Sequence, residues 1–474
     1  MTRFIGRARE LEALQEAYAS NRAELVVVYG RRRLGKTSLL TQFCADKPSV
    51  FYPAKLQSNT MQLQDFSAML KNAGAPLLQI IDSVPTWEAA FSQLGQIPCN
   101  GKRLIVIDEF PYMVEGDASI PSILQHLWDH ELQKQNVMIV LCGSALAFME
   151  KEVLSEKSPL FGRATRTIRV LPMDFADARL FFFDYSASDQ VLAYSVLGGS
   201  PYCLQCFDPQ VSLKDNVVRQ LLSPRGFLWD FPQRAIIQEC REPGRYNDIM
   251  RTIICGSRRF SEIAAKTVIE SANLPRYLRV LSELGFVERE FPADHGIKEE
   301  ANRQRGLYCL QDNLASFWYQ YVWPNLAALT MGGEEFVWET QIAPKLNEIA
   351  AFPFEDVCRQ YLWKLNIKHL LPFAARSIDR WWNKNEEIDL LAVPVQGDER
   401  LFGECKFRES RFDLGDLMNL KKKIELVPHS QAHFSLFSKS GFTPAVEELA
   451  RDPAEQITLF TLEDVVNGAE KRVL

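Results

Sequence analysis

The chain has 474 residues, of which 47% are hydrophobic and 24% are charged, and its formal net charge is −6 with a pI near 5.7. At about 150 residues per domain, this length predicts roughly three domains. The acidic balance excludes a protein that coats nucleic acid over its whole surface, although a local basic surface can still bind it. No apolar run approaches the length of about 18 residues that a membrane-spanning helix needs. The charged N-terminus lacks the apolar core of a signal peptide, so a cytoplasmic location is expected.

The first predicted feature along the chain is a phosphate-binding loop at residues 30–37. Its sequence, Gly-Arg-Arg-Arg-Leu-Gly-Lys-Thr, follows an apolar run at residues 25–29 and precedes a helix-like segment at residues 37–44. Glycines in such a loop turn backbone N–H groups toward a phosphate chain. Lys36 would place a cation on the outer phosphates, and Thr37 would offer a hydroxyl to Mg²⁺. The motif predicts binding of a nucleoside triphosphate, with an ordinary glycine turn as the minor alternative.

Two later strands end in residues that suit the same site. The strand at residues 104–107 is followed by Asp108 and Glu109, and the strand at residues 137–142 is followed shortly by Ser144. Sheets of this kind bind ligands at the carboxyl ends of their strands. Asp108 is expected on the Mg²⁺ side, Glu109 as the acceptor that polarises the attacking water, and Ser144 as a hydroxyl that senses the γ-phosphate. Hydrolysis is therefore expected in addition to binding.

These motifs resemble those of the AAA+ and STAND branch of P-loop ATPases, and specifically the archaeal-type ATPase family that is also found in bacteria. The resemblance spans nearly the whole chain and includes Phe4-Ile5-Gly6-Arg7 with Glu10, Pro159-Leu160-Phe161-Gly162-Arg163, and Gly198-Gly199-Ser200-Pro201-Tyr202. It implies that residues 4–10 border the adenine and that residues 198–202 belong to a helical lid. It also implies that Arg163 is an arginine finger for a neighbouring subunit in a homo-oligomer. Arg166 is the runner-up, and a surface salt bridge is the alternative for both.

The residues expected to contact ATP and its Mg²⁺ come from these segments. Those in or beside the phosphate-binding loop and the following strand are Gly30, Arg31, Arg32, Arg33, Leu34, Gly35, Lys36, Thr37, Ser38 and Asp108. The resemblance adds Ile5, Arg7 and Pro201. Thr37 and Asp108 are the expected ligands of Mg²⁺. The expected catalytic residues are Glu109, Ser144 and Arg163.

Four parts are expected along the chain. Residues 1–172 alternate β-branched runs with helical stretches, as in a parallel sheet with crossover helices, and residues 173–240 have the helical periodicity of a lid. Residues 241–330 contain three helices, a strand, a polar loop and a second strand, which is the plan of a winged helix. After a Gly-Gly pair expected to be a linker, residues 335–474 form the last part. The expected fold class is α/β, with a P-loop AAA+-like ATPase core, a helical lid, a winged helix and a C-terminal α/β domain.

The third helix of the winged-helix segment carries Arg276, Tyr277 and Arg279, which can face phosphates or base edges. Over residues 246–290, however, Lys and Arg number 7 against 6 for Asp and Glu. That balance is unlike the charge of a dedicated DNA reader. In AAA+ and STAND relatives such winged helices often pack on the ATPase core, so a structural role for this segment is at least as well favoured as DNA readout. The aromatic run at residues 317–323 is expected to be core rather than a stacking platform.

A second set of charged residues lies beyond residue 335. Glu355 is on a helix-like segment, Asp389 opens a strand, and Glu404, Cys405 and Lys406 lie on the next strand. Alternate side chains of a strand share a face, so Glu404 and Lys406 point the same way and Asp389 can meet them. Two carboxylates and the Cys405 carbonyl can hold Mg²⁺ or Mn²⁺. Lys406 can then position or activate a water for attack on a phosphodiester.

This arrangement resembles the PD-(D/E)xK fold of restriction-endonuclease-like nucleases, which archaeal-type ATPases often carry at the C-terminus. The resemblance implies a metal-dependent DNA nuclease in which Glu355, Asp389, Glu404 and Lys406 are catalytic. Asp389 and Glu404 are the implied metal ligands. The leading Pro-Asp of that fold is Ile-Asp here. A basic stretch at residues 408–423 can grip a DNA backbone, and a solvated helix face is an equal alternative.

Three functions are compatible with these motifs. The leading hypothesis is an ATP-hydrolysing protein whose nucleotide state controls the C-terminal DNA nuclease, in genome defence or mobile-element processing. The second is a STAND-type nucleotide switch or scaffold whose C-terminal domain binds DNA or protein without cleaving. The third is a transcriptional regulator that uses the winged helix. Complete catalytic residues favour the nuclease, and the weak basic character of the chain favours the switch.

Overall fold

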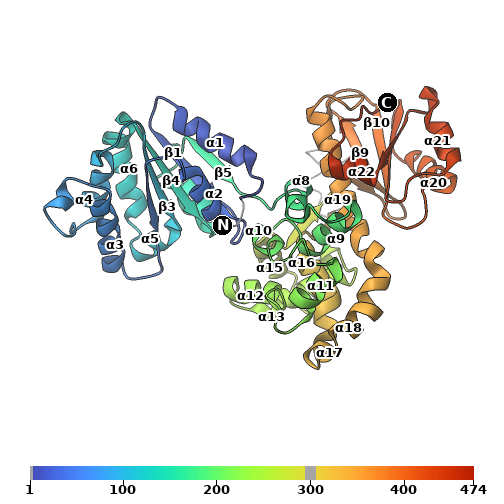
Figure 1. Ribbon diagram of the computed structural model, residues 1–474, viewed down its shortest axis with the longest axis horizontal. Helices are drawn as coiled ribbons and strands as arrows, with labels where there is room; N and C mark the ends of the chain where they lie inside the picture. The colour runs from blue at the N-terminus through green and yellow to red at the C-terminus, as the bar shows by residue number, and fades with distance from the viewer. Residues whose placement is uncertain (1–3, 294–305) are drawn as a thin grey trace. The chain divides into compact units, whose positions relative to one another are not determined.

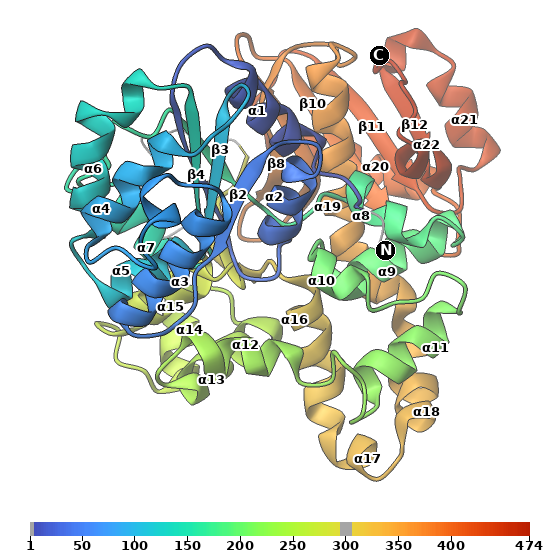
Figure 2. The same ribbon diagram turned by 60° about the vertical axis from the view of Figure 1, so that its left-hand side comes forward.

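The structure is a computed structural model that describes residues 4–293 and 306–474 (Figures 1 and 2). The chain divides into two compact units. The first runs to Met173 and includes Ser200–Tyr202, whereas the second contains Asp174–Gly199 and Cys203–Leu474. Each unit has its own five-stranded sheet. No helix within the described ranges is both long and apolar enough to span a membrane.

The first unit is built on a parallel sheet with the strand order β2-β3-β4-β1-β5. The strands are β1 (Glu24–Tyr29), β2 (Ser49–Pro53), β3 (Arg103–Asp108), β4 (Val137–Gly143) and β5 (Arg166–Arg169). β1 and β4 are buried along their whole length, because they are nearly continuous runs of apolar residues. The predicted parallel sheet is confirmed. Since β3, β4 and β1 are neighbours, their carboxyl ends meet at one edge.

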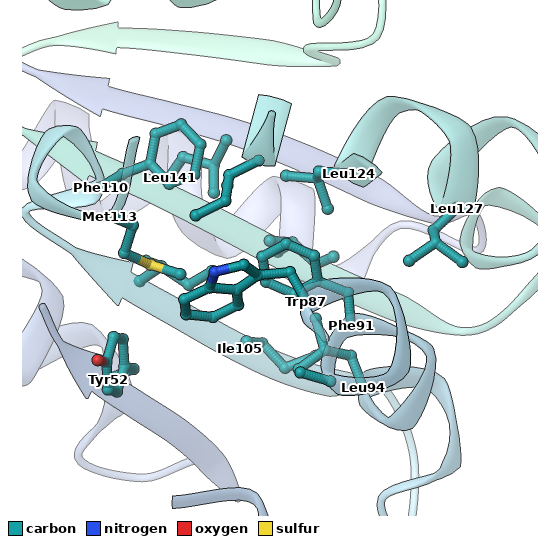
Figure 3. Close-up of a cluster of buried hydrophobic side chains, with 14 of the residues drawn as sticks. Tyr52, Trp87, Phe91, Leu94, Ile105, Phe110, Met113, Leu124, Leu127 and Leu141 are labelled. Atoms are coloured by element: carbon teal, nitrogen blue, oxygen red, sulfur yellow. The ribbon is translucent and has the colours of Figure 1, made fainter. Parts of the chain in front are cut away.

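Helices cover both faces of this sheet (Figure 1). One face carries α1 (Ala8–Ala19) and α2 (Lys36–Cys44), and the other carries α3 (Asn59–Asn72), α4 (Trp87–Ser92), α5 (Phe110–Gly116) and α6 (Ile120–His130). Along each strand, alternate side chains point to opposite faces and pack in the two hydrophobic cores. In the core under α3 to α6, the ring centroids of Trp87 and Phe91 lie 5.5 Å apart (Figure 3). The Phe66 ring packs against both, 5.4 Å from that of Trp87 and 5.5 Å from that of Phe91. Truncating such a buried aromatic ring typically costs about 3–5 kcal/mol of stability.

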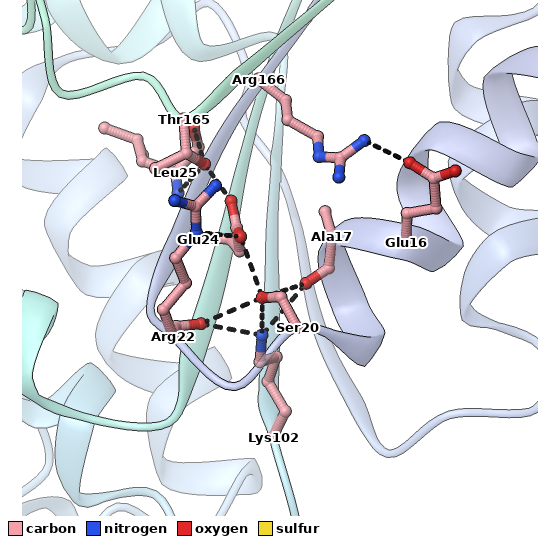
Figure 4. A network of polar contacts seen from close by, with 9 residues as sticks. All are labelled: Glu16, Ala17, Ser20, Arg22, Glu24, Leu25, Lys102, Thr165 and Arg166. Atoms are coloured by element: carbon pink, nitrogen blue, oxygen red, sulfur yellow. Dashed lines mark hydrogen bonds and ion pairs between the residues drawn. The ribbon is translucent and has the colours of Figure 1, made fainter.

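A polar network closes the opposite edge of the first sheet (Figure 4). The Lys102 ammonium, which is 5% exposed, donates to the carbonyl oxygens of Ala17 at 3.0 Å and Arg22 at 2.9 Å and to Ser20 Oγ at 2.9 Å. Ser20 and Arg22 also donate to the buried carboxylate of Glu24. Carbonyl oxygens at the end of a helix favour a cation. The network therefore ties the end of α1 to the start of β3, away from the edge where ligands bind.

The second unit begins with a helical region and a small antiparallel hairpin. The helices include α8 (Phe175–Ala178), α9 (Ala187–Leu197), α11 (Leu213–Val217), α12 (Phe231–Glu239), α13 (Pro243–Ile254), α14 (Phe260–Thr267) and α15 (Leu274–Glu283). The hairpin pairs β6 (Val287–Glu290) with β7 (Leu307–Leu310). The predicted order of three helices and two strands is observed, and the polar loop between the strands falls largely outside the described residues. Its assignment as a winged helix stays a prediction.

Two expectations for this region differ from the structure. Tyr277 cannot face DNA, because its ring is buried and its hydroxyl donates to Glu242 Oε2 at 2.6 Å, whereas Arg276 and Arg279 are exposed. The Gly-Gly pair is a turn rather than a linker. Gly332, at φ +83°, adopts a conformation that favours glycine and connects α17 (Leu326–Thr330) to α18 (Glu334–Val337), which pack together.

The aromatic run at residues 317–323 is core, as predicted. Trp318 is 1% exposed, and its indole nitrogen donates to the Trp229 carbonyl oxygen at 2.5 Å. Tyr319 and Tyr321 are buried as well. A buried indole N–H needs such a partner, because leaving it unpaired would cost about 1–3 kcal/mol.

The C-terminal part of the second unit is a mixed sheet with the order β12-β11-β10-β9-β8. Its strands are β8 (Ala375–Trp382), β9 (Glu387–Pro394), β10 (Arg400–Lys406), β11 (Ala432–Ser438) and β12 (Ile457–Thr461). β8, β9 and β10 pair antiparallel, and β10, β11 and β12 pair parallel. One face packs against α19 (Leu346–Ile367) and α22 (Leu462–Asn467), and the other against α20 (Leu414–Ile424) and α21 (Pro444–Ala450). The start of β9 thus lies beside the end of β10.

Candidate functional site

The phosphate-binding loop joins β1 to α2, in the strand-loop-helix context that the motif requires. Gly30 must be glycine, because a Cβ there would lie 2.3 Å from the Val170 carbonyl oxygen. Gly35, at φ +84°, provides the left-handed turn into α2. The Lys36 ammonium is buried in the loop and donates to the carbonyl oxygens of Gly30 at 2.8 Å and Arg31 at 3.0 Å. Burial lowers its pKa. The loop combines a cation with the amino end of a helix, as an anion site requires.

The two expected Mg²⁺ ligands are in direct contact. Thr37 Oγ1 donates to Asp108 Oδ2 at 2.7 Å, and Asp108 Oδ1 accepts the backbone N–H of Glu109 at 3.1 Å. Asp108 is only 4% exposed. A hydroxyl and a carboxylate, completed by phosphate oxygens and waters, suit the oxygen preference of Mg²⁺.

Glu109 is held by the end of the neighbouring strand. Its Oε2 accepts the backbone N–H of Ser144 at 3.2 Å and the Ser144 hydroxyl at 2.9 Å. Glu109 lies at φ +53°, a left-handed conformation that is strained for a non-glycine residue. Arg32 reaches the same group, since its Nε donates to Ser144 Oγ at 3.4 Å and its Nη2 to the Tyr112 hydroxyl at 2.9 Å. A carboxylate, a hydroxyl and a guanidinium thus meet at the carboxyl ends of β3 and β4.

Residues expected beside the adenine support the loop from two sides. Arg7 is buried, and its guanidinium donates to the Leu34 carbonyl oxygen at 3.0 Å and to Glu10 at 2.9 Å. Ile5 is half-buried. Pro201 lies beside Gly35, 3.7 Å from the position a Cβ would take there. Ser200 donates to the Arg33 carbonyl oxygen at 3.2 Å. The Ser200–Tyr202 segment therefore rests on the phosphate-binding loop.

Both candidate arginine fingers form ion pairs within the chain and do not project freely from its surface. Arg163 forks onto Asp129 with Nη2–Oδ2 and Nε–Oδ1 distances of 2.8 and 3.1 Å. Arg166 pairs with Glu16 at 2.8 Å (Figure 4). Both pairs lie within one chain and match the surface salt bridge that was the alternative. A catalytic role for either arginine stays a prediction.

In the second unit, the antiparallel pairing of β9 and β10 brings Asp389 opposite the end of β10. Asp389 Oδ2 accepts the backbone N–H of Cys405 at 2.8 Å. Lys406 forms an ion pair with Glu404 Oε1. Glu404 is 3% exposed, and its Oε2 has no hydrogen-bond partner among the described residues. Burial raises the pKa of Asp389 to about 7, and the charge of Glu404 adds to the shift. Two carboxylates and an ammonium therefore share one partly buried position.

Glu355 joins this cluster from α19. Its Oε2 lies 3.3 Å from Arg380 Nε, and Arg380 also pairs with Glu387 at 3.0 Å and Glu290 at 3.5 Å. Burial raises the pKa of Glu355 well above its usual range, and the charge of Asp389 raises it further. Across residues 4–293 and 306–474, no group of three His, Cys, Asp or Glu side chains is arranged to hold a metal. A metal here would need the Cys405 carbonyl or water to complete its ligands.

Sequence reasoning missed Arg380. No motif marks it, and it reaches Glu355 because α19 packs against β8. The basic stretch at residues 408–423 is partly neutralised, since Arg408 pairs with Asp416 and Lys421 with Glu455. Those two pairs match the solvated-face alternative.

Comparison with known proteins agrees with the first site. Residues 4–207 match a family model described as an ATPase domain predominantly from Archaea, and residues 318–420 match one described as Archaea bacterial proteins of unknown function. The chain is 31% identical over 408 residues to the uncharacterized protein MJECL04 of Methanocaldococcus jannaschii, which covers 86% of this chain and 88% of that protein.

Two solved structures are also similar. The Walker-type ATPase PABY2304 of Pyrococcus abyssi is 19% identical, covers 67% of this chain and 96% of its own, and has a TM-score of 0.49. The ORC2 protein of Aeropyrum pernix, in ADPNP–ADP complexes, is 14% identical, covers 70% of this chain and 98% of its own, and has a TM-score of 0.41. With the match over most of the Methanocaldococcus protein, the chain belongs to the family of archaeal-type P-loop ATPases that includes that protein.

Proposed function

We propose that this ATPase controls a metal-dependent DNA nuclease at its own C-terminus. The ATPase part of this proposal rests chiefly on two contacts beside the phosphate-binding loop. Thr37 contacts Asp108, and Glu109 contacts Ser144, at the carboxyl ends of the strands. Bound Mg²⁺ would neutralise the phosphates between Thr37 and Asp108. Lys36 would exchange its two carbonyl acceptors for phosphate oxygens. Glu109 would accept a proton from the water that attacks the γ-phosphate.

A binding experiment tests the ATP site. Lys36→Ala removes the only ammonium of the loop, so ATP affinity should fall by at least tenfold in calorimetry with Mg²⁺. Lys134→Ala is a matched control, because it removes an exposed ammonium ahead of β4, at the opposite edge of the same sheet. Equal affinity in wild type and Lys36→Ala would refute the assignment of the loop.

The nuclease half is supported by the meeting of Asp389, Glu404 and Lys406 at neighbouring strand ends. A divalent metal bound by the two carboxylates would lower the charge of the phosphodiester and polarise the attacking water. Lys406 is placed to orient that water. The water oxygen would bond to phosphorus and release a proton to solvent, while the bond to the leaving oxygen breaks and that oxygen takes up a proton from solvent. Genome defence or mobile-element processing is the setting we propose.

Cleavage is tested on supercoiled, linear and branched DNA with Mg²⁺ or Mn²⁺. The wild type should nick or cut at least one form, and Asp389→Ala should lose cleavage while it keeps ATP turnover. If the wild type cuts none of these substrates with or without ATP, the nuclease proposal fails.

A non-cleaving nucleotide switch is the second candidate. It is favoured by the ion pair between Arg380 and Glu355, which already compensates one carboxylate, and by the lack of a three-donor metal group in the described ranges. This function predicts tight nucleotide retention with negligible turnover, together with a nucleotide-dependent change in oligomer size by light scattering. Rapid turnover at constant size would count against it.

A further inference from the structure

A cavity of about 460 Å³ lies beside the C-terminal carboxylates in the second unit. Its lining comes from β6 and residues 291–293, from β7 and the residues after it, from the first half of α19, and from β8 and β9. Glu355 and Asp389 form part of its lining. The cavity therefore opens onto Asp389, to which the nuclease proposal assigns metal binding, and onto Glu355, which the resemblance to nucleases implies to be catalytic.

Backbone and ionic contacts hold the walls together. The Ala293 backbone N–H donates to the Arg380 carbonyl oxygen at 2.8 Å, and Ser377 Oγ donates to the Ala293 carbonyl oxygen at 3.4 Å. Glu290 of the hairpin lies 3.5 Å from the Arg380 guanidinium. Residues 291–293 thus run beside β8 as one wall of the cavity.

Arginines and aromatic rings share the lining with the carboxylates. Arg380 lies 4.9 Å from the Phe352 ring centroid, and Arg289 lies 5.0 Å from that of Phe291. Arg359 is occupied by Asp356 and Asp379. Arg376 differs from them, because it is exposed and makes no hydrogen bond or ion pair with any residue that the structure describes.

We propose that this cavity binds one unpaired nucleotide of a nucleic-acid strand, with its phosphate held by the guanidinium of Arg376. The volume is within the range of about 300–1,000 Å³ for small-ligand sites and admits no duplex. Bases stack on aromatic rings and on guanidinium planes, and a guanidinium can grip a phosphate with two hydrogen bonds. Enzymes that work in such a small pocket take a single strand or extrude the nucleotide. The inference rests on the proposed nuclease site and specifies its substrate as an unpaired strand.

Binding is measured on the full chain carrying Lys36→Ala, so that the ATP site takes no probe, with Ca²⁺ as the metal. Fluorescence anisotropy follows a 5′-labelled (dT)8 strand, with competition by a blunt 12-base-pair duplex and by dTMP. The strand should bind at least tenfold more tightly than either competitor. Arg376→Ala should weaken strand binding about tenfold, and Arg376→Lys should restore part of it. Arg451→Ala, which removes an exposed arginine just after α21, should change nothing.

Three results would overturn the inference: equal affinity for strand and duplex, strand affinity unchanged in Arg376→Ala, or tight dTMP binding that the strand does not displace. The last would assign the cavity to a free nucleotide. Failure of the nuclease is a separate result. If the strand binds in a way that depends on Arg376 but is not cleaved, the cavity proposal holds and the nuclease proposal fails. If cleavage depends on Asp389 but not on Arg376, the nuclease proposal holds and the cavity proposal fails.

A second inference concerns Arg32 of the phosphate-binding loop. Its guanidinium donates to the Ser144 hydroxyl, which in turn donates to Glu109, so two hydrogen bonds connect this cation to the carboxylate that polarises the water. The side chain is exposed at the edge of the sheet where the phosphates bind. Arg163 and Arg166 form ion pairs with Asp129 and Glu16, away from this group. We infer that Arg32 stabilises the charge on the γ-phosphate in cis, without a neighbouring subunit.

Turnover kinetics separate the two arrangements. An arginine at the transferring phosphate is worth about 10³–10⁵ in rate. Arg32→Ala should therefore lose at least 10²-fold in kcat with ATP affinity changed less than threefold, and Arg32→Lys should recover part of the loss. Specific activity should be independent of protein concentration. Unchanged turnover in Arg32→Ala, or activity that rises with concentration and disappears in Arg163→Ala, would overturn the inference.

Discussion

The ATP site and the C-terminal carboxylate site are assembled in different ways. At the ATP site, eight consecutive residues build the loop, and the remaining groups follow the ends of adjacent parallel strands. Its contacts are mostly hydrogen bonds between one charged and one neutral group, such as Thr37 to Asp108. At the C-terminal site, three carboxylates from a helix and two strands are crowded together, and burial raises the pKa of two of them. The first site offers positive groups to the negative charge of a phosphate ligand, whereas the second site has an excess of negative charge from its own carboxylates.

The largest expected effect is on ATP turnover. Glu109→Gln keeps the shape of the side chain and its acceptor oxygen but removes the base, so kcat should fall by about 10²–10⁴-fold while ATP still binds. Phosphate release reports turnover, and calorimetry reports binding. Glu115→Gln, an exposed carboxylate on α5, is the control. Full activity in Glu109→Gln would remove Glu109 from the mechanism.

The next effect concerns the compensating charge at the C-terminal site. Arg380→Ala leaves Glu355 buried without its cation, so the free energy of unfolding should drop by about 3 kcal/mol at pH 8. The drop should be smaller at pH 5, because the already raised pKa of Glu355 lets it take up a proton instead. Urea denaturation at the two pH values measures both. A loss of the same size at pH 5 and pH 8 would mean that charge is not the cause.

A gain in stability is expected where excess negative charge is removed. The pKa of Asp389 is about 7 when folded, above its value when unfolded, so ionising it destabilises the folded state as pH rises toward 7. Three pKa units correspond to at most about 4 kcal/mol, and partial exposure reduces this to about 1–3 kcal/mol. Asp389→Asn should therefore be more stable than wild type at pH 8 in EDTA, with the difference vanishing near pH 4. Added Mg²⁺ should stabilise the wild type only.

The smallest effect belongs to the exposed ion pair in the first unit. Arg163 and Asp129 are each about one-third exposed, so Arg163→Ala should cost less than about 1 kcal/mol of unfolding free energy. Comparing this cost with that of Arg380→Ala tests whether burial determines how much each ion pair contributes to the free energy of unfolding. A cost near 3 kcal/mol for Arg163→Ala would contradict that explanation.

The sequence predicted the first unit more completely than the second, for a physical reason. A phosphate-binding loop is local, and parallel strands bring Asp108, Glu109 and Ser144 to the same edge whatever the details of the turns. The meeting of Asp389 with the strand that carries Glu404 was also predicted, because both strands are visible as local sequence patterns, and the catalytic roles of the two residues stay predictions. Arg380 and the cavity were not predicted, because they depend on the packing of α19 against β8 and on a contact between β8 and residue 293, which is distant in the sequence. The Gly-Gly turn was misread because a glycine pair serves a tight helical turn and a linker equally well.

The most direct test of the central claim is the rate of DNA cleavage with Mg²⁺ in the presence and absence of ATP, for wild type, Lys36→Ala and Asp389→Ala. ATP should change the wild-type rate and leave the rate of Lys36→Ala unchanged, and Asp389→Ala should not cleave in either condition. Wild-type cleavage that ignores ATP, or cleavage that persists in Asp389→Ala, would contradict an ATP-controlled nuclease in this chain.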